Sequence, residues 1–284
     1  MVNRSFLIYQ RFLVITLADN FNSTDGREDK KDRQNNKSKK ILIFIIVFIL
    51  VFVIVMAVLN VYNKSVSTPP EETTVTTQTQ SQQVTVENPI DFDTLQSGND
   101  EIYAWIKIDD TKVDYPIVQS KSDDAFYLRH KAEDKSWSSS GAIYTELANT
   151  KTFGDYVTVI YGHNGYSDSM FTTLHYFEKE EFFNSHPYFY IYTPTKRLKY
   201  QVVSAFKYDD RHILNSFDFA KEEVLTDFQQ MIQDPDSSLK NVRTELDTEI
   251  NTKSRIVVLS TCITNQKSSR YLVCGVLVEN EKTN

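Results

Sequence analysis

The chain has 284 residues, and its 31 Lys and Arg against 38 Asp and Glu give a formal net charge of −7 at pH 7. A chain of this length can hold one or two domains. An acidic balance repels phosphate backbones, so it argues against nucleic acid as a partner. The only two cysteines, Cys262 and Cys274, are too few for a disulfide-rich secreted scaffold. A disulfide between them stays open, but one reactive thiol beside a buried, inert one is the better interpretation.

The first strong pattern is an apolar run over residues 41–59, which contains no polar side chain. At a rise of ~1.5 Å per residue this run covers about 28 Å, close to the ~30 Å hydrocarbon core of a bilayer. A buried core helix of that length would be expected to show a polar stripe. A cleaved signal peptide fits less well, because the run exceeds the usual apolar region and no small-residue cleavage site follows. We therefore expect a transmembrane helix over residues 41–62.

Basic residues before this run predict its orientation. Lys37, Lys39 and Lys40 directly precede it, and residues 1–40 hold nine Lys and Arg against five Asp and Glu. By the positive-inside rule, residues 1–40 form a cytoplasmic tail and everything after the span is extracytoplasmic. Since the span is uncharged, the remaining residues carry −11 of the net charge. The pattern thus predicts a single-pass protein of the cell membrane, although residues 1–36 have no evident role.

The extracytoplasmic part begins with a polar segment. Residues 63–88 are rich in Thr, Gln and Ser and contain no large apolar residue except valine. Such a segment cannot bury enough surface to offset its ordering entropy, so it predicts a flexible tether. The globular domain is expected over residues 89–284, with a helical start near residues 91–105. Eight β-type runs follow at 105–108, 113–119, 141–145, 156–162, 188–193, 198–208, 255–261 and 271–279.

Two amphipathic helices are expected among these runs. One follows a capping Asp168, and the other follows Asp218. Their apolar faces are Met170, Phe171, Leu174 and Phe177 in the first, and Val224, Leu225, Phe228, Met231 and Ile232 in the second. Eight short strands with a few helices predict a mainly β fold, a closed or nearly closed β-barrel, which leaves no strand edge exposed.

Cys262 is the candidate nucleophile. It ends the apolar run VVLSTC, where a polar loop over residues 263–269 is expected. A thiol at the mouth of a strand is partly exposed, as a nucleophile must be, although a small core-lining cysteine is the commoner alternative.

His163 closes another strand, in VIYGHNG, between Gly162 and Gly165, which permit a tight exit or close approach of substrate. Histidine is the side chain best suited to proton transfer near neutral pH. Arg270, eight positions after Cys262, can return to the same end of the sheet and offers N–H donors to a developing oxyanion, unless it is simply solvated. Four further histidines have plainer settings: His130, His175, His186 and His212.

The chain lacks the spacing patterns of metal and nucleotide sites, including H-E-x-x-H, C-x-x-C and the P-loop, so no cofactor is expected. Two motifs instead resemble those of the sortase family. Leu259–Cys262, followed by Arg270, is similar to the TLxTC…R signature, with Val258 in place of its first Thr. Tyr161–Asn164, Y-G-H-N, is similar to the family's strand-end histidine motif. The resemblance implies an eight-stranded barrel over roughly residues 90–279.

Three further features resemble class B sortases: a helical segment before the barrel, a helix inserted before the cysteine-bearing strand at residues 218–233, and the stretch FYLRHKAEDKSWSSSGAIYTE. The aromatic or Asp-Pro plug of class C enzymes is absent from the sequence. Three alternatives stay open: a class C- or D-like sortase, a plain thiol endopeptidase, and a non-enzymatic tethered binding barrel. The last predicts that Cys262, His163 and Arg270 lie apart.

The resemblance also implies a reaction at the surface of a Gram-positive cell. Cys262 attacks the threonine carbonyl of an N-P-x-T or S-P-x-T sorting signal, and His163 protonates the departing amine. An amine of a cell-wall precursor or cross-bridge then resolves the thioacyl intermediate, while Arg270 stabilises the oxyanions. Ser260, on the same strand face as the cysteine, is implied as a peptide contact. Leu128 is a further pocket candidate, or else a core residue.

Overall fold

The structure, a computed structural model, describes residues 47–48, 51, 85–165 and 167–284. The expected cytoplasmic tail, nearly all of the expected membrane span and most of the expected tether therefore lie outside the described residues. In the part of the chain that is described, no helix is long and apolar enough to cross a bilayer. The chain divides into two compact units, Met1–Gln78 and Thr79–Asn284, and the second unit contains the barrel.

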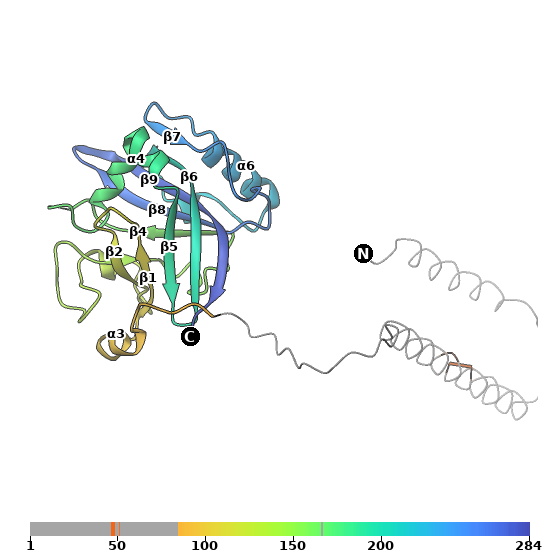
Figure 1. The fold of residues 1–284 in the computed structure, drawn as a ribbon, viewed down its shortest axis with the longest axis horizontal. Helices are drawn as coiled ribbons and strands as arrows, with labels where there is room; N and C mark the ends of the chain where they lie inside the picture. Colours follow the sequence, from red (N-terminus) through yellow and green to blue (C-terminus); the bar gives the residue numbers. More distant parts are fainter. Residues whose placement is uncertain (1–46, 49–50, 52–84, 166) are drawn as a thin grey trace, which may run out of the picture. The chain divides into compact units, whose positions relative to one another are not determined.

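The second unit is built around a closed ring of eight strands (Figure 1). Around the ring the order is β5-β1-β2-β3-β4-β8-β9-β6, and pairing between β5 and β6 closes it. The strands of the ring are β1 (Ile102–Lys107), β2 (Asp114–Val118), β3 (Ile143–Tyr144), β4 (Val157–Tyr161), β5 (Tyr188–Thr193), β6 (Lys196–Asp209), β8 (Ile256–Ile263) and β9 (Gln266–Lys282). A ninth strand, β7 (Lys240–Val242), pairs with β6 outside the ring. The predicted eight-stranded barrel is confirmed.

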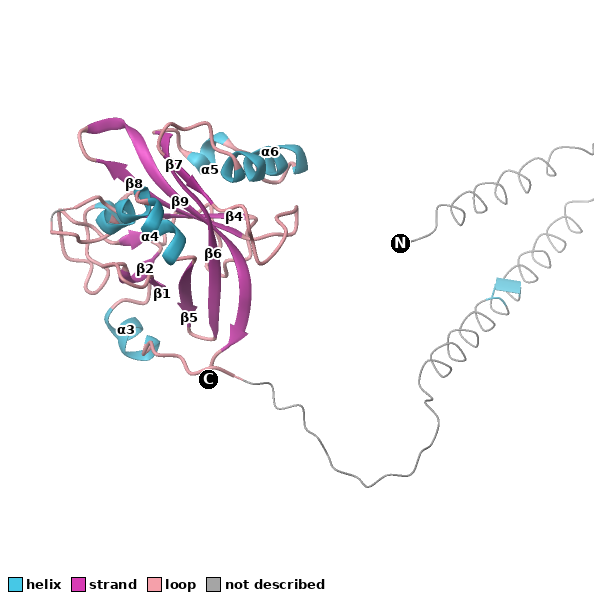
Figure 2. Cartoon of the chain, turned by 45° about the horizontal axis from the view of Figure 1, so that its top comes forward, coloured by secondary structure: helices cyan, strands magenta, loops and turns pink. Residues whose placement is uncertain are grey.

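Short helices connect the strands. They are α3 (Phe92–Gly98), η2 (Phe126–Leu128), η3 (Thr172–Glu178), α4 (Glu180–Ser185), α5 (Ile213–Ser216) and α6 (Glu222–Gln233), where η marks a 3₁₀ helix. Helix α3 lies at the end of the barrel near the C-terminus, whereas α4 and α6 lie toward the other end (Figures 1 and 2). The predicted helices before the barrel and before the cysteine-bearing strand are both present.

The strand predictions hold for every run, and the differences are local. The sequence missed β7, because three half-exposed residues form no apolar run. The first expected helix is the 3₁₀ helix η3, and Asp168 does not cap it, because the helix begins at Thr172 and Phe171 holds the N-cap position. The second expected helix begins at Glu222 rather than directly after Asp218, and the short α5 precedes it.

Three hydrophobic clusters hold the strands: one inside the ring, one between the sheet and α6, and a smaller one around Tyr127. Strand β4 is buried on both faces from Val157 to Ile160, and β8 likewise from Ile256 to Thr261. This double burial explains why both strands are continuous apolar runs rather than alternating ones. Phe228 of α6 is 1% exposed, and burying such a side chain contributes about 1.5–3 kcal/mol. The two strands are thereby fixed firmly up to the points where they reach solvent.

Candidate active site

The ends of β4 and β8 meet at one edge of the barrel. These strands pair in parallel, and Tyr161 lies opposite Ser260 at the last matched position. The Gly162 N–H extends the ladder by donating to the Ser260 carbonyl at 3.2 Å. His163 and Cys262 each lie two residues beyond the Tyr161–Ser260 pair. Because neighbouring strands are about 4.8 Å apart, this register brings the segment after β4 and the end of β8 to the same edge of the barrel.

Strand β9 adds Arg270 on the other side of Cys262. The two residues are directly opposite in the antiparallel β8–β9 pairing. The segment expected as a loop over residues 263–269 is mostly strand, because β9 begins at Gln266 and the turn places Asn265 at φ 62°. The sequence prediction of a polar loop was wrong there, since exposed Lys, Ser and Gln side chains can also occupy a hairpin that projects into solvent. Arg270 lies within β9 rather than at its start.

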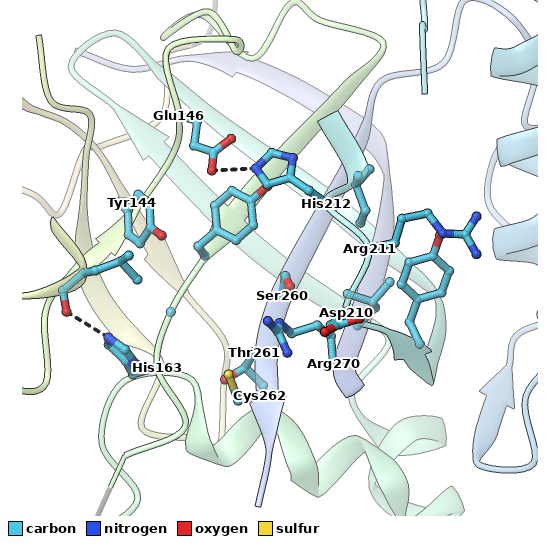
Figure 3. A pocket seen from close by; sticks show the side chains of 16 residues that line it. Tyr144, Glu146, His163, Asp210, Arg211, His212, Ser260, Thr261, Cys262 and Arg270 are labelled. Carbon is cyan, nitrogen blue, oxygen red and sulfur yellow. Dashed lines mark hydrogen bonds and ion pairs between the residues drawn. The ribbon is translucent and has the colours of Figure 1, made fainter. Parts of the chain in front are cut away.

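A cavity of about 290 Å³ opens at this edge. Its walls include all five residues predicted for the site: Leu128, His163, Ser260, Cys262 and Arg270. Figure 3 shows His163, Cys262 and Arg270 around one part of the cavity, with Glu146 and His212 further along it. The alternative of a non-enzymatic binding barrel predicted that His163, Cys262 and Arg270 would lie apart, whereas all three line this cavity.

The His163 ring is held by a backbone contact. Its Nε2 lies 2.9 Å from the Leu128 carbonyl oxygen, so this nitrogen carries a proton and donates. Among the described residues, no hydrogen bond joins His163 to Cys262. Leu128 is 37% exposed and thus belongs to the cavity wall rather than to the core. The imidazole therefore lies beside the cavity either as the neutral tautomer protonated on Nε2 or as the imidazolium.

The Arg270 guanidinium is also oriented by backbone. One terminal nitrogen, Nη1, donates to the carbonyls of Lys267 and Ser269 at 3.2 and 3.1 Å. These bonds fold the side chain back along its own hairpin, and the planar fork leaves the remaining N–H groups for other acceptors. Arg270 can thus present a fixed positive charge at the wall that it shares with Cys262.

Gly162 is required by packing beneath the histidine. A Cβ atom at this position would lie 2.5 Å from Ile143 Cδ1 and 2.6 Å from Phe171 Cδ2, closer than real Cβ atoms come. The Phe171 N–H in turn donates to the His163 carbonyl at 3.0 Å. The sequence predicted that Gly162 permits a close approach, and the groups that approach it are the core side chains Ile143 and Phe171. The hydrogen bond from Phe171 then fixes the backbone that bears His163.

Sequence reasoning missed several polar residues near the cavity. His212 donates from Nε2 to a Glu146 carboxylate oxygen at 2.9 Å, because its Nδ1 accepts the backbone N–H of Asn215. This pair lines the cavity beside Tyr161, whose hydroxyl is buried without a partner. Burial raises the pKa of Tyr161 above its usual range, so its hydroxyl stays protonated. No motif distinguished His212 from other loop histidines.

The two cysteines have opposite environments. Both are free, so the disulfide left open by the sequence is absent from this structure. Cys262 is exposed, whereas Cys274 is fully buried. Burial raises the pKa of the Cys274 thiol, which keeps it in the neutral, unreactive form. The expected division into one accessible and one inert thiol is confirmed.

Similarity to known proteins agrees with this geometry. A family model described as the sortase domain matches residues 106–278. Sortase B of Listeria monocytogenes is 30% identical over 186 residues, which cover 65% of this chain and 72% of that protein. The X-ray structure of Clostridium perfringens sortase B has a TM-score of 0.57 and 28% identity, over 66% of this chain and 100% of that one. A Staphylococcus aureus sortase B–substrate complex has a TM-score of 0.57 and 25% identity, over 66% and 84%. The barrel carries an exposed cysteine near the end of β8, and these relatives are sortase B proteins. The chain therefore belongs to the sortase family of cysteine transpeptidases.

Proposed function

We propose that this chain is a class B sortase that cleaves a surface-protein sorting signal after threonine and transfers the acyl group to a cell-wall amine. The observation that carries the proposal is that His163, Cys262 and Arg270 line one cavity, with Cys262 opposite Arg270 in the β8–β9 pairing and His163 two residues past the end of the adjacent β4. Three strands of a closed barrel cannot shift independently, so this arrangement holds the groups in place before substrate arrives.

Two steps account for the transfer. The Cys262 thiolate attacks the threonine carbonyl, an Sγ–C bond forms, and the C–N bond breaks as protonated His163 gives its proton to the leaving amine. The acceptor amine then attacks the thioacyl carbon, the C–S bond breaks, and His163 takes the proton from the amine. The exposure of Cys262 allows both the peptide and the second amine to reach the sulfur.

Arg270 is assigned to the oxyanion in both steps. Its guanidinium is already oriented by two backbone carbonyls, so few degrees of freedom are lost when it binds the developing charge. The tetrahedral intermediate forms on the carbon bonded to Cys262 Sγ, and Cys262 is the residue opposite Arg270 in the β8–β9 pairing.

The sorting peptide is assigned to the cavity. Ser260 forms part of its wall two residues before the nucleophile, and Leu128 offers an exposed apolar surface on the side of His163. An extended or kinked segment containing proline loses little entropy on docking, which suits a narrow cavity. We therefore assign N-P-x-T or S-P-x-T signals to this site.

The membrane placement remains part of the proposal. The apolar run at residues 41–59, with basic residues before it, is the feature that supports a single-pass anchor and an extracytoplasmic catalytic domain. A membrane-impermeant protease applied to intact protoplasts should digest the domain. Protection of the domain would show that the orientation is reversed.

Cleavage assays with and without an added amine test the reaction itself. Purified full-length chain in detergent is mixed with N-P-x-T-G, S-P-x-T-G and L-P-x-T-G peptides, with triglycine present or absent. When triglycine is present we expect a ligated product in which triglycine follows the threonine, two glycines longer than the starting peptide, and a thioacyl adduct on Cys262 by mass spectrometry. Hydrolysis alone, at a rate unaffected by triglycine, would instead identify a thiol endopeptidase.

A further inference from the structure

The carbonyl oxygen of Cys262 is held by two side chains from outside its own hairpin. Asn164 Nδ2 donates to this oxygen at 3.0 Å, and His175 Nε2 lies 3.1 Å from it. Asn164 directly follows His163, and its amide also donates to Thr264 Oγ1 at 3.1 Å. These contacts therefore tie the loop that bears the histidine to both the nucleophile and the turn beyond it.

The His175 ring is itself fixed on two sides. Its Nδ1 lies 2.6 Å from a Glu178 carboxylate oxygen, so this nitrogen carries a proton and donates. Its face stacks on Tyr271 with ring centroids 4.9 Å apart. The side chain is 20% exposed, and Tyr271 is a fully buried residue of β9. The ring thus has little freedom to leave the Cys262 carbonyl.

Proton counting shows how the network is satisfied. The Asn164 amide has two protons and three neighbours within reach: Cys262 O, Thr264 Oγ1 and His175 Nε2, the last at 3.2 Å. When His175 is an imidazolium, Nε2 donates to the Cys262 carbonyl, and the two amide protons serve the carbonyl and the threonine. When the ring is neutral, Nε2 accepts from Asn164 instead. In either state, the imidazole is linked to Cys262 directly or through Asn164.

We propose that Asn164, His175 and Glu178 form a positioning cluster that sets the geometry between His163 and Cys262. This inference rests on the proposed function, in which Cys262 bonds to the scissile carbonyl carbon while His163 gives a proton to the amine that leaves it. None of the three positioning residues touches the reacting atoms. They act on the backbone oxygen of Cys262. The β4–β8 ladder has already ended at this point, so side-chain contacts take the place of its backbone hydrogen bonds.

The distinction from a purely structural role lies in what each variant keeps. His175→Phe keeps an aromatic ring over Tyr271 and loses the Nε2 contact. His175→Gln can place an amide N–H near the former Nε2 and so restores the donor. His186 supplies a matched control, because it is 16% exposed, stacks on Phe182 and pairs with Asp110 at 2.9 Å, yet lines no part of the cavity.

Steady-state kinetics of the full-length chain in detergent, with N-P-x-T-G peptides and triglycine, give the first readout. We expect His175→Phe to lower kcat roughly tenfold with KM within about twofold, since one hydrogen bond to a positioned group is lost. The kcat of His175→Gln should lie within about threefold of that of the unmodified chain. The kcat of His186→Gln should equal that of the unmodified chain. Asn164→Ala combined with His175→Phe should lose less than the product of the single losses, because both act on one carbonyl.

Carbonyl ¹³C spectra give a readout that needs no substrate. With [1-¹³C]cysteine the chain yields two signals, one from Cys262 and one from Cys274 as an internal reference. Loss of a donor should move the Cys262 signal upfield in Asn164→Ala, and in His175→Phe at a pH where His175 is an imidazolium, while the Cys274 signal stays in place. Thermal unfolding of each variant identifies any that fails to fold. If His175→Phe fails to fold, His175→Gln and Asn164→Ala are used for the test.

Three results would overturn the inference: an unmoved Cys262 signal in Asn164→Ala, an unchanged kcat in His175→Phe, or an equal loss of kcat in His186→Gln. A KM increase with unchanged kcat would assign His175 to peptide binding instead. Failure of the proposed function looks different. In that case the unmodified chain would turn over no peptide at all, and a responsive Cys262 signal would be left without a catalytic meaning.

Discussion

Cys262 and Cys274 lie on the same pair of strands, and their environments differ completely. Cys262 is near the end of β8, exposed, opposite Arg270. Cys274 is in the middle of β9, opposite Val258, and fully buried. One thiol lines the cavity, and the other packs in the hydrophobic cluster that α6 covers. A single two-stranded ribbon therefore holds both a reactive environment and an inert one.

The difference shows that reactivity here depends on position along the strand, not on the sheet itself. In the middle of the ribbon, each backbone group is paired and α6 shields the outer face, so burial keeps the Cys274 thiol neutral. At the end, the ladder stops, and side chains from η3 and from the loop after β4 take over the backbone contacts. A strand end thus provides exposure and a fixed backbone together, which a catalytic nucleophile requires.

The largest expected effect comes from exchanging each thiol for a hydrogen atom. Cys262→Ala should abolish peptide cleavage while leaving the free energy of unfolding nearly unchanged, because the side chain is exposed. Cys274→Ala should retain turnover, since this thiol lies in the core away from the cavity. Cleavage assays and denaturant unfolding on both variants measure this. A dead Cys274→Ala that still folds would reverse the assignment of the nucleophile.

The next effect concerns the residues that face each cysteine across the strand pair. Arg270→Lys keeps a positive charge but loses the planar fork, so we expect kcat to fall about 100-fold with normal folding. Val258→Ala, opposite Cys274, should leave kcat within about twofold and lower stability by about 1–3 kcal/mol through a core cavity. Near-native kcat for Arg270→Lys would remove Arg270 from the oxyanion site.

A smaller effect tests the two thiols without any substrate. At pH 9 iodoacetamide should modify Cys262 in the folded chain and leave Cys274 unmodified. Cys274 should not react because burial raises the pKa of its thiol, so the reactive thiolate is scarce at this pH. The Cys274 sulfur is also inaccessible to the reagent. Cys274→Ala should cost only about 1 kcal/mol, because one sulfur atom leaves a small cavity. Modification of Cys274 under native conditions would contradict its assignment as an inert core residue.

Sequence reasoning predicted the barrel because its strands are local apolar patterns, and the five residues predicted for the site line one cavity. Of these five, Ser260 and Leu128 were implied by the family resemblance and not by a local pattern. Strands β4 and β8 are apolar runs that lead into His163 and Cys262, and each run was predicted as a strand. That these two strands are neighbours was not predicted; it comes from the parallel β4–β8 pairing. The Cys274 environment was equally readable, because an apolar run surrounds it.

Contacts that depend on tertiary placement were not readable. His175 was assigned a plain helical setting, but the 3₁₀ geometry of η3 and the stacking on Tyr271 bring it to the Cys262 carbonyl. His212 likewise reaches Glu146 only because residues 66 positions apart meet at the cavity. Neither contact has a fixed spacing, so no pattern in a single sequence indicates them.

The last prediction concerns which covering segment selects the peptide, and its expected effect on turnover is the smallest. A helix inserted before the cysteine-bearing strand has an apolar face that one side of the barrel must cover, so the sequence favours residues 209–233 and that strand as the walls of the peptide groove. Within that segment, only residues 210–213 line the cavity, whereas the apolar face of α6 packs in the cluster that contains Cys274. The prediction therefore narrows to the short stretch Asp210–Ile213.

Two chimeras separate these parts, each receiving the equivalent piece of another class B sortase. Replacing residues 210–213 should change the preference among N-P-x-T-G, S-P-x-T-G and L-P-x-T-G peptides, with kcat on the best peptide within about threefold, because the reacting groups lie on other strands. Replacing residues 222–233 should leave the preference unchanged and act on the free energy of unfolding, since α6 covers Cys274 rather than the cavity. Ratios of kcat/KM across the three peptides measure the preference directly. If the α6 chimera shifts those ratios and the 210–213 chimera does not, the peptide runs along the helix, and the cavity beside Cys262 holds only its threonine.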